Sequence, residues 1–212
     1  MNNLLYSKNI SLFFKMNIKE ALQSFSPYDE WKELAYTPFT IDDADRIIEF
    51  YHQAGRKDYS IEHIQFEYDN GTLFHGVEKD GKIIAGMLVH SEYVYSNAPS
   101  FLAFYEKRKE AIILNSDSVY SSHNYVISNA RGQHLYTFLL YNVLSYYKDI
   151  KKDYVLMTGI NNYKMIKSSF FHKGRLFGII QSSLVLKLFR NKHEYYMDKE
   201  EKCWENVPII KN

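Results

Sequence analysis

The sequence predicts an α/β domain of the α+β type, in which a mixed central sheet of about six or seven strands is flanked by helices. A hairpin is the first indication, because two apolar runs, 73–78 and 82–90, are joined by Asp80 and Gly81, a pair that tight turns prefer. A strand, a turn and a helix then follow one another over 118–147. With 46% hydrophobic and 24% charged residues, the 212-residue chain can bury one sizeable core.

The first part of the chain has a helical pattern. Residues 1–30 predict a short N-terminal helical extension, because Ile18, Leu22 and Phe25 recur at helical spacing before a proline ends the pattern. The predicted organisation is an extension at 1–30, one domain at 31–190 and a C-terminal tail at 191–212 that is too polar to assign.

The remaining elements alternate between helix and strand. Thr40 is a suitable N-cap for a helix whose first turn holds Asp42 and Asp43, and Gly55 ends this helix. The other predicted segments are an extended stretch at 34–37, helices at 61–68, 98–114, 135–147 and 163–172, and strands at 118–127, 154–160 and 176–189, the last holding one or two strands.

Charge and cysteine content exclude several classes of protein. A formal net charge of +1 argues against a protein that coats nucleic acid or an anionic membrane. The single cysteine, Cys203, cannot form an internal disulfide, no CxxC or HExxH spacing indicates a metal site, and no run approaches the ~20 apolar residues of a membrane-spanning helix. We therefore expect a cytoplasmic protein with no metal and with neither nucleic acid nor membrane as partner. The oligomeric state, a homodimer included, stays open.

One strand-to-helix turn has the features of a phosphate-binding loop. Residues 126–136 read Val-Ile-Ser-Asn-Ala-Arg-Gly-Gln-His-Leu-Tyr, and N–H groups at such a helix start carry the partial positive charge that a pyrophosphate needs. Together with Asn162 after the next strand and Lys173-Gly174 after the next helix, this segment resembles the GNAT N-acyltransferase family, whose pyrophosphate loop has the pattern Arg/Gln-x-x-Gly-x-Gly/Ala. The resemblance extends over residues 34–189.

The resemblance implies a GNAT fold that uses acetyl-coenzyme A, or another acyl-coenzyme A, as co-substrate. The pantetheine arm would lie between the strands 118–127 and 154–160, held by Asn162, while Lys173 and Arg175 would contact the 3′-phosphate. A backbone N–H of the first of these strands would polarise the thioester carbonyl. The residues expected to bind coenzyme A are Tyr125, Val126, Ile127, Arg131, Gly132, Gln133, His134, Leu135, Tyr136, Asn162, Lys173 and Arg175.

The sequence differs from the family pattern at three positions. His134 stands where the family prefers Gly, and Tyr136 where it prefers Gly or Ala, so a Cβ at position 134 either points away from the ligand or narrows the site. Phe170 stands where many members carry the tyrosine that protonates the leaving thiolate. Tyr163 and His172 are the nearby candidates for this acid; the alternatives are that both are packing or surface residues and that water supplies the proton.

The local charge is consistent with a nucleotide ligand. Between Arg131 and Arg175 there are eight Lys or Arg residues and two acidic residues, a net charge of +6. Coenzyme A carries several phosphate charges, so a positive field in an otherwise balanced chain favours such a partner.

Acyl transfer to an amine needs a group that removes the amine's proton. His123, just before the loop, is the first candidate for this general base because the ordinary pKa of histidine lies near neutrality; the alternative is a hydrogen-bonded strand histidine. His90 and Glu92, at the end of the hairpin, are the second candidates, or else surface residues.

The leading hypothesis is an N-acyltransferase that moves an acetyl or other short acyl group from acyl-coenzyme A directly to a primary amine of a small molecule. A protein or peptide acceptor would need an open groove across the hairpin. The alternative is a non-catalytic module that binds acyl-coenzyme A, or a partner protein, on the same fold. Release of thiol from acetyl-coenzyme A with a panel of amines discriminates the two classes.

Overall fold

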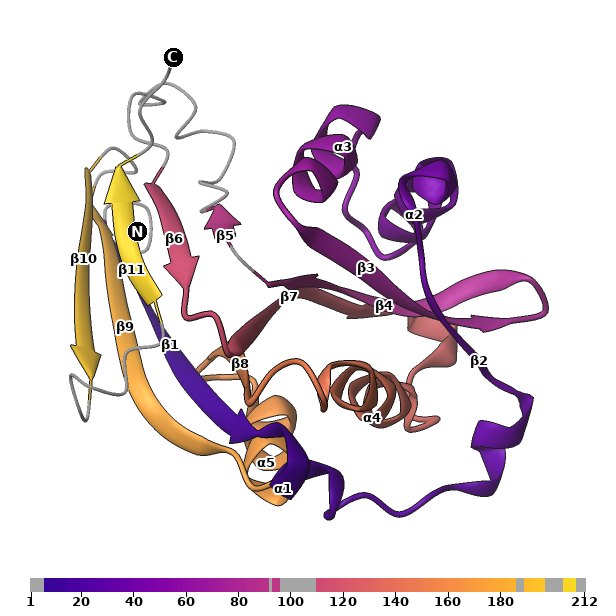
Figure 1. Ribbon diagram of the computed structural model, residues 1–212. Coiled ribbons are helices and arrows are strands. Elements are labelled where there is room, and N and C mark those ends of the chain that lie inside the picture. Colours follow the sequence, from indigo (N-terminus) through magenta and orange to yellow (C-terminus); the bar gives the residue numbers. More distant parts are fainter. Residues whose placement is uncertain (1–5, 92, 96–109, 186–188, 197–203, 209–212) are drawn as a thin grey trace.

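An eight-stranded sheet runs through the molecule, with the order β10-β9-β1-β8-β7-β4-β3-β2. The computed structural model describes residues 6–91, 93–95, 110–185, 189–196 and 204–208 (Figure 1). All neighbouring strands are antiparallel except β7 and β8, so the expected mixed sheet is confirmed. The bounds are β1 Tyr6–Asn17, β2 Ala35–Pro38, β3 Thr72–Lys79, β4 Lys82–His90, β7 Ser118–Val126, β8 Asp153–Gly159, β9 Arg175–Val185 and β10 Phe189–Tyr196.

Helices cover both faces of this sheet. Helices α2 and α3 lie on one face, and α4 and α5 lie on the other, where the short α1 sits beside them (Figure 1). Their bounds are α1 Ile18–Leu22, α2 Ala44–Gln53, α3 Ile61–Asp69, α4 Leu135–Tyr147 and α5 Tyr163–Phe171, with 3-10 turns η2 Asp29–Glu33, η3 Ile41–Asp43 and η5 Ser128–Ala130. In the part of the chain that is described, none of the helices has the length and apolarity needed to cross a membrane.

The N-terminal segment contributes a central strand, so the prediction of a helical extension at 1–30 is wrong. Strand β1 pairs with β8 on one side and with β9 on the other. Phe13, Phe14 and Met16 are all buried, because a strand in the middle of a covered sheet buries both of its faces and shows no clean alternation. Among the described residues of this segment, from Tyr6 onward, only Ile18–Leu22 is α-helical. The segment is therefore part of the domain.

The predicted boundary at residue 190 is also wrong, because β10 continues the sheet at the edge beside β9. The polar composition that concealed this strand is compatible with an edge position. Most of the helix predicted at 98–114 lies outside the described residues, but Glu110–Leu114 forms strand β6. It pairs with β5 (Tyr93–Tyr95) and β11 (Trp204–Pro208) in a second, three-stranded sheet.

Aromatic rings fill the space between the sheet and the helices α2 and α3. Phe74 of β3 is fully buried, and its ring centroid lies 5.6 Å from those of Phe39, Phe50 and Tyr51. A glycine on the neighbouring strand makes room for this ring, since a Cβ at Gly86 would lie 2.2 Å from Phe74 Cζ. The packing of this face therefore depends on the absence of a side chain at position 86.

The opposite face carries a fully buried histidine beneath α4. His75 Nδ1 lies 2.6 Å from the Tyr36 hydroxyl, and His75 Nε2 lies 3.3 Å from the Tyr147 hydroxyl. Burial lowers the pKa of His75 to about 3, because an imidazolium cannot be solvated there.

This histidine is expected to make the fold sensitive to acid. The unfolded chain takes up a proton at His75 near pH 6.5, whereas the folded chain does so only near pH 3. The free energy of unfolding should therefore fall, by up to about 1.4 kcal/mol per pH unit, as the pH drops from the first value toward the second. Urea unfolding of the wild type and of His75→Gln at several pH values measures this; the variant should show a smaller slope, and equal slopes would contradict the assignment.

Candidate active site

Strands β7 and β8 are paired along only part of their length. Their parallel register ends with Ser121 opposite Leu156. Beyond this point β7 continues to pair with β4 as far as Val126, and β8 with β1 as far as Gly159, so both remain strands without pairing to each other. The sheet therefore parts between β7 and β8 just before the chain enters α4.

The start of α4 offers backbone N–H groups at this opening. The first bond of the helix runs from Phe138 N to the carbonyl of His134, at 3.0 Å. The N–H groups of Leu135, Tyr136 and Thr137 precede that bond and have no intrahelical partner. The side chain of the N-cap residue, His134, makes no capping hydrogen bond. These amides and the helix dipole together suit an anionic group.

Two left-handed residues shape the turn from β7 into α4. Gly132 has φ +91°, and His134 has φ +55°. The His134 ring stacks on Tyr28, with centroids 4.3 Å apart and planes 9° apart, while Arg131 Nε donates to the carbonyl of Val126 at 3.2 Å. The histidine at the position where a glycine was expected is thus accommodated by a left-handed conformation, with its ring held by Tyr28.

A buried polar atom without a hydrogen-bond partner among the described residues lies at the point where the strands part. Ser121 Oγ accepts from the Tyr154 hydroxyl at 2.5 Å and from Asn124 Nδ2 at 3.3 Å. Asn124 Oδ1 has no hydrogen-bond partner among the described residues. The Tyr136 hydroxyl lies beside the hydroxyl of Tyr154 and interacts with it. Burial raises the pKa of Tyr136, so its hydroxyl keeps its proton and remains a donor. A polar ligand or a water molecule can satisfy a buried acceptor of this kind.

On the other face of the sheet, β7 carries a bulge centred on His123. Its φ is +52°, and the register with β4 shifts at this point. The His123 ring lies under the loop between α2 and α3, with its centroid 5.6 Å from that of Tyr59. In this loop Arg56 pairs with both carboxylate oxygens of Asp58 and donates to the Tyr125 hydroxyl at 2.6 Å. Burial and Arg56 lower the pKa of His123 to about 4, so the ring is neutral at pH 7.

The structure brings His123 and His90, two of the predicted catalytic residues, to one hydroxyl. Ser122 Oγ lies 2.6 Å from His90 Nε2 and 3.0 Å from His123 Nδ1. The other ring nitrogen of His90, Nδ1, lies 3.0 Å from Thr72 Oγ1 and 3.7 Å from Glu67 Oε2. Sequence reasoning missed Ser122, Thr72 and Glu67, because they lie on three different elements and no motif links them.

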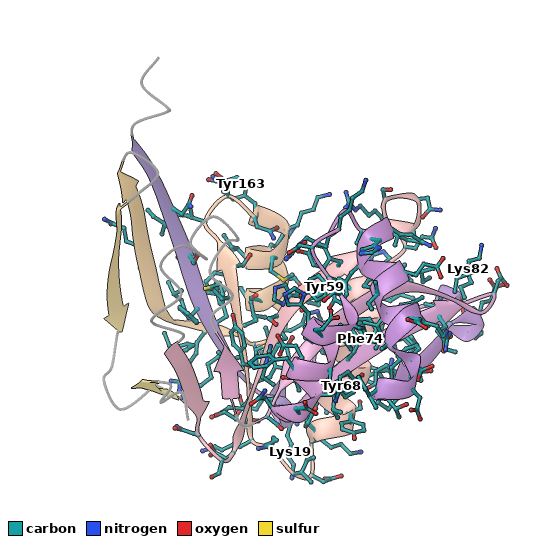
Figure 2. The ribbon with its side chains drawn as sticks, turned by 90° about the horizontal axis from the view of Figure 1, so that it is seen from above. Lys19, Tyr59, Tyr68, Phe74, Lys82 and Tyr163 are labelled. Atoms are coloured by element: carbon teal, nitrogen blue, oxygen red, sulfur yellow. The ribbon has the colours of Figure 1, made fainter. Side chains whose placement is uncertain are left out.

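The residues predicted at the start of α5 lie in different environments. Asn162 is the N-cap of α5, and its Oδ1 accepts from Met165 N at 3.3 Å, which leaves its amide N–H groups for a ligand. Tyr163 projects outward and is 74% exposed (Figure 2). Glu92 lies outside the described residues.

Lys173 and Arg175 are not brought together with the turn into α4. Arg175 pairs with Lys15 of β1, and Lys15 pairs with Val155 near the start of β8. The turn into α4 lies at the other end of β7, beyond the last pair of β7 with β8. The expectation that these two cations contact the same nucleotide as the loop therefore has no support from the register.

His172 and Phe170, near the end of α5, make packing contacts with other aromatic rings. His172 is buried, stacks on Phe25 with centroids 3.9 Å apart, and its Nδ1 lies 2.9 Å from the Ser24 hydroxyl. Burial lowers the pKa of His172 to about 4. Phe170 packs edge-on against Phe14 at a centroid distance of 5.1 Å. Of the two interpretations of His172, as an acid for the thiolate or as a packing residue, these contacts favour the packing residue.

Within the described residues, no group of three or more His, Cys, Asp and Glu side chains is arranged to hold a metal ion. No protein-family model and no curated protein matches the chain.

Solved structures resemble the chain in fold. A tandem GNAT protein from the clavulanic acid biosynthesis pathway matches with a TM-score of 0.59 and 13% identity over 86% of this chain and 55% of its own. A GCN5-related N-acetyltransferase from Sphaerobacter thermophilus matches with a TM-score of 0.57 and 12% identity over 85% of this chain and 53% of its own. A conserved protein of unknown function from Staphylococcus epidermidis matches with a TM-score of 0.55 and 7% identity, over 84% and 61%.

The chain thus spans between 53% and 61% of the length of these three structures. Identities this low carry information about the fold alone. Because more than four fifths of this chain aligns with these structures at TM-scores of 0.55 to 0.59, we conclude that it has the fold of the GNAT acetyltransferases.

Proposed function

We propose that this chain transfers an acetyl or other short acyl group from acyl-coenzyme A directly to the primary amine of a small molecule. The observation that carries the proposal is the opening between β7 and β8, which has unused helix N–H groups at its mouth and, at its base, the unpartnered Asn124 Oδ1 near the buried hydroxyls of Tyr136 and Tyr154. A long, thin ligand with an anionic end and amide groups along its arm is complementary to such a site.

The polar groups of the site match the parts of coenzyme A. The pyrophosphate would accept from the N–H groups of Leu135, Tyr136 and Thr137, within the segment of net charge +6. The pantetheine arm would lie between β7 and β8, where Asn124 Oδ1 can accept from an amide N–H and the Tyr136 hydroxyl can donate. Asn162, at the end of β8, would hold the arm from the other side.

Transfer then needs one base and one proton donor. The amine nitrogen attacks the thioester carbonyl, forms the N–C bond and gives a proton to His123 Nε2, while the C–S bond breaks and the thiolate takes a proton. The Tyr136 hydroxyl is the buried donor at the base of the opening, and it serves where Phe170 cannot. The rings of Tyr59 and Tyr125 around His123 support a small acceptor.

The proposed binding predicts that changing Gly132 to valine weakens coenzyme A binding by at least about tenfold. A φ of +91° is strained for a β-branched residue, so the turn that aims the α4 amides should change shape. Isothermal titration with coenzyme A measures the effect. Gly81→Val is the matched control, because Gly81 also has positive φ with nothing within 4 Å of a Cβ, but lies in the β3–β4 turn.

Turnover is tested with acetyl-coenzyme A and a panel of small primary amines, by following free thiol and identifying the acylated amine by mass spectrometry. The proposal expects thiol release that depends on the amine. It also expects coenzyme A alone to raise the melting temperature, by mass action. Binding without turnover for any amine would contradict transfer and leave the non-catalytic module.

A further inference from the structure

We propose that Glu67, Thr72, His90 and Ser122 form a hydrogen-bonded proton relay that carries the amine's proton inward from His123. This inference rests on the proposed function for the source of the proton. The five side chains come from α3, β3, β4 and β7, and consecutive members lie within hydrogen-bonding distance. None of the residues other than His123 needs to touch the substrate, so they are positioning residues.

The direction of each hydrogen bond follows from the carboxylate at the inner end. Thr72 Oγ1 donates its single proton to Glu67 Oε2 at 3.1 Å. It must therefore accept at 3.0 Å from His90 Nδ1–H, which leaves His90 Nε2 unprotonated. That nitrogen accepts from the Ser122 hydroxyl at 2.6 Å.

The same reasoning determines the tautomer of His123. Because the Ser122 proton is given to His90, Ser122 Oγ accepts from His123 Nδ1–H at 3.0 Å. His123 Nε2 is then the unprotonated nitrogen, at the outer end of the chain. The arrangement leaves a base exposed to substrate and an anionic acceptor at the other end.

Proton uptake at His123 reverses the donor and acceptor of every hydrogen bond in the relay. When Nε2 takes the substrate proton, Nδ1–H passes its proton to Ser122, Ser122 to His90 Nε2, His90 Nδ1–H to Thr72, and Thr72 to Glu67. One proton enters and one O–H forms on the carboxyl group. Neither imidazole stays charged.

Burial explains why such a transfer is favourable. Glu67, Thr72 and His90 are at most 4% exposed, whereas Ser122 and His123 are half-buried, so the relay leads from the substrate side into the interior. Burial raises the pKa of Glu67 and lowers that of His123. A proton held on His123 alone is therefore costly, and neutralising a buried carboxylate offsets this cost.

Other titratable and charged groups border the relay. They are Arg56, Asp58, Tyr59 and His63 from the loop between α2 and α3 and from α3, Tyr51 from α2, and Tyr120 and Tyr125 from β7. Burial raises the pKa of Tyr51, Tyr59 and Tyr120, so these phenols stay neutral at the pH values of the test.

Nuclear magnetic resonance of the ring nitrogens tests the relay without any substrate. In the full chain labelled with ¹⁵N, two-bond proton–nitrogen spectra should show His123 and His90 as Nδ1–H tautomers above the pKa of Glu67. Lowering the pH through that pKa should switch both to Nε2–H, and Glu67→Gln should abolish the switch. An Nε2–H tautomer of His123 at high pH, or a switch that survives in Glu67→Gln, overturns the proposal.

Enzyme kinetics provide a second test of the relay. With a weakly basic amine acceptor, Glu67→Gln and Ser122→Ala should each lower kcat by at least about tenfold, while KM for acetyl-coenzyme A stays the same. Ser122→Thr keeps the hydroxyl and should restore most of the loss. An unchanged kcat in Glu67→Gln overturns the relay. If no amine is acylated at all, the proposed function fails. The nuclear magnetic resonance experiment then still decides whether the two histidines and Glu67 act as one relay.

Discussion

Replacing His123 with asparagine is expected to lower kcat/KM for acyl transfer by about 10²–10⁴-fold at neutral pH. Asparagine tolerates the left-handed conformation at this position, where φ is +52°, so the bulge in β7 should persist. The amide side chain cannot take up the proton of the amine. Initial rates of thiol release from acetyl-coenzyme A with a primary amine measure the loss.

The control for this variant is His63→Asn, which makes the same change at an exposed position of α3 and should leave the rate near that of the wild type. Coenzyme A affinity should also be unchanged in His123→Asn, because the His123 ring faces the loop between α2 and α3, on the face of the sheet opposite α4 and its amides (Figure 1). A rate within a few-fold of the wild type would remove His123 from the mechanism. A parallel loss of coenzyme A affinity would assign it a structural role instead.

Replacing Gly86 with alanine is expected to lower the free energy of unfolding by about 1–3 kcal/mol. The new Cβ would lie 2.2 Å from Phe74 Cζ and 2.7 Å from Phe74 Cε2, and the ring is fully buried among other rings. It cannot move without displacing Phe50, which is itself 3.1 Å from that Cβ. Urea unfolding followed by fluorescence or circular dichroism gives the difference.

Gly159→Ala is the matched control, because a Cβ at Gly159 meets nothing within 4 Å and should change stability by less than about 0.5 kcal/mol. A second test is to shrink the ring: Phe74→Leu should lose stability in the wild type but lose less when combined with Gly86→Ala. Additive losses in the double variant would show that the ring and the new methyl group do not collide.

Local sequence signals predicted the β3–β4 hairpin and helix α4 well. The hairpin of β3 and β4 follows from Asp80-Gly81, and α4 begins and ends at the predicted residues 135 and 147. Both depend on interactions within about 15 residues, which a local pattern contains. Strand β1 was misread for the opposite reason, because its partners β8 and β9 lie more than 130 residues away.

The candidate site rests partly on signals that the sequence contains. The turn into α4 could be proposed as an anion site because the start of a helix is encoded in consecutive residues. His123 and His90 were chosen for the ordinary chemistry of imidazole, and the sequence held no sign that Ser122 would join them. Tyr136 was expected to act through its amide, whereas the structure also buries its hydroxyl next to that of Tyr154.

The sequence by itself determined the β3–β4 hairpin, helix α4 and the N-terminus of this helix, because hydrogen bonds between near neighbours and a short apolar period decide these. Tertiary structure decided which strands part, which histidines share a serine, and which carboxylate is buried behind them. The five side chains of the relay are spread along the sequence from Glu67 to His123, on α3, β3, β4 and β7. Only the pairing register of the sheet brings their atoms within hydrogen-bonding distance.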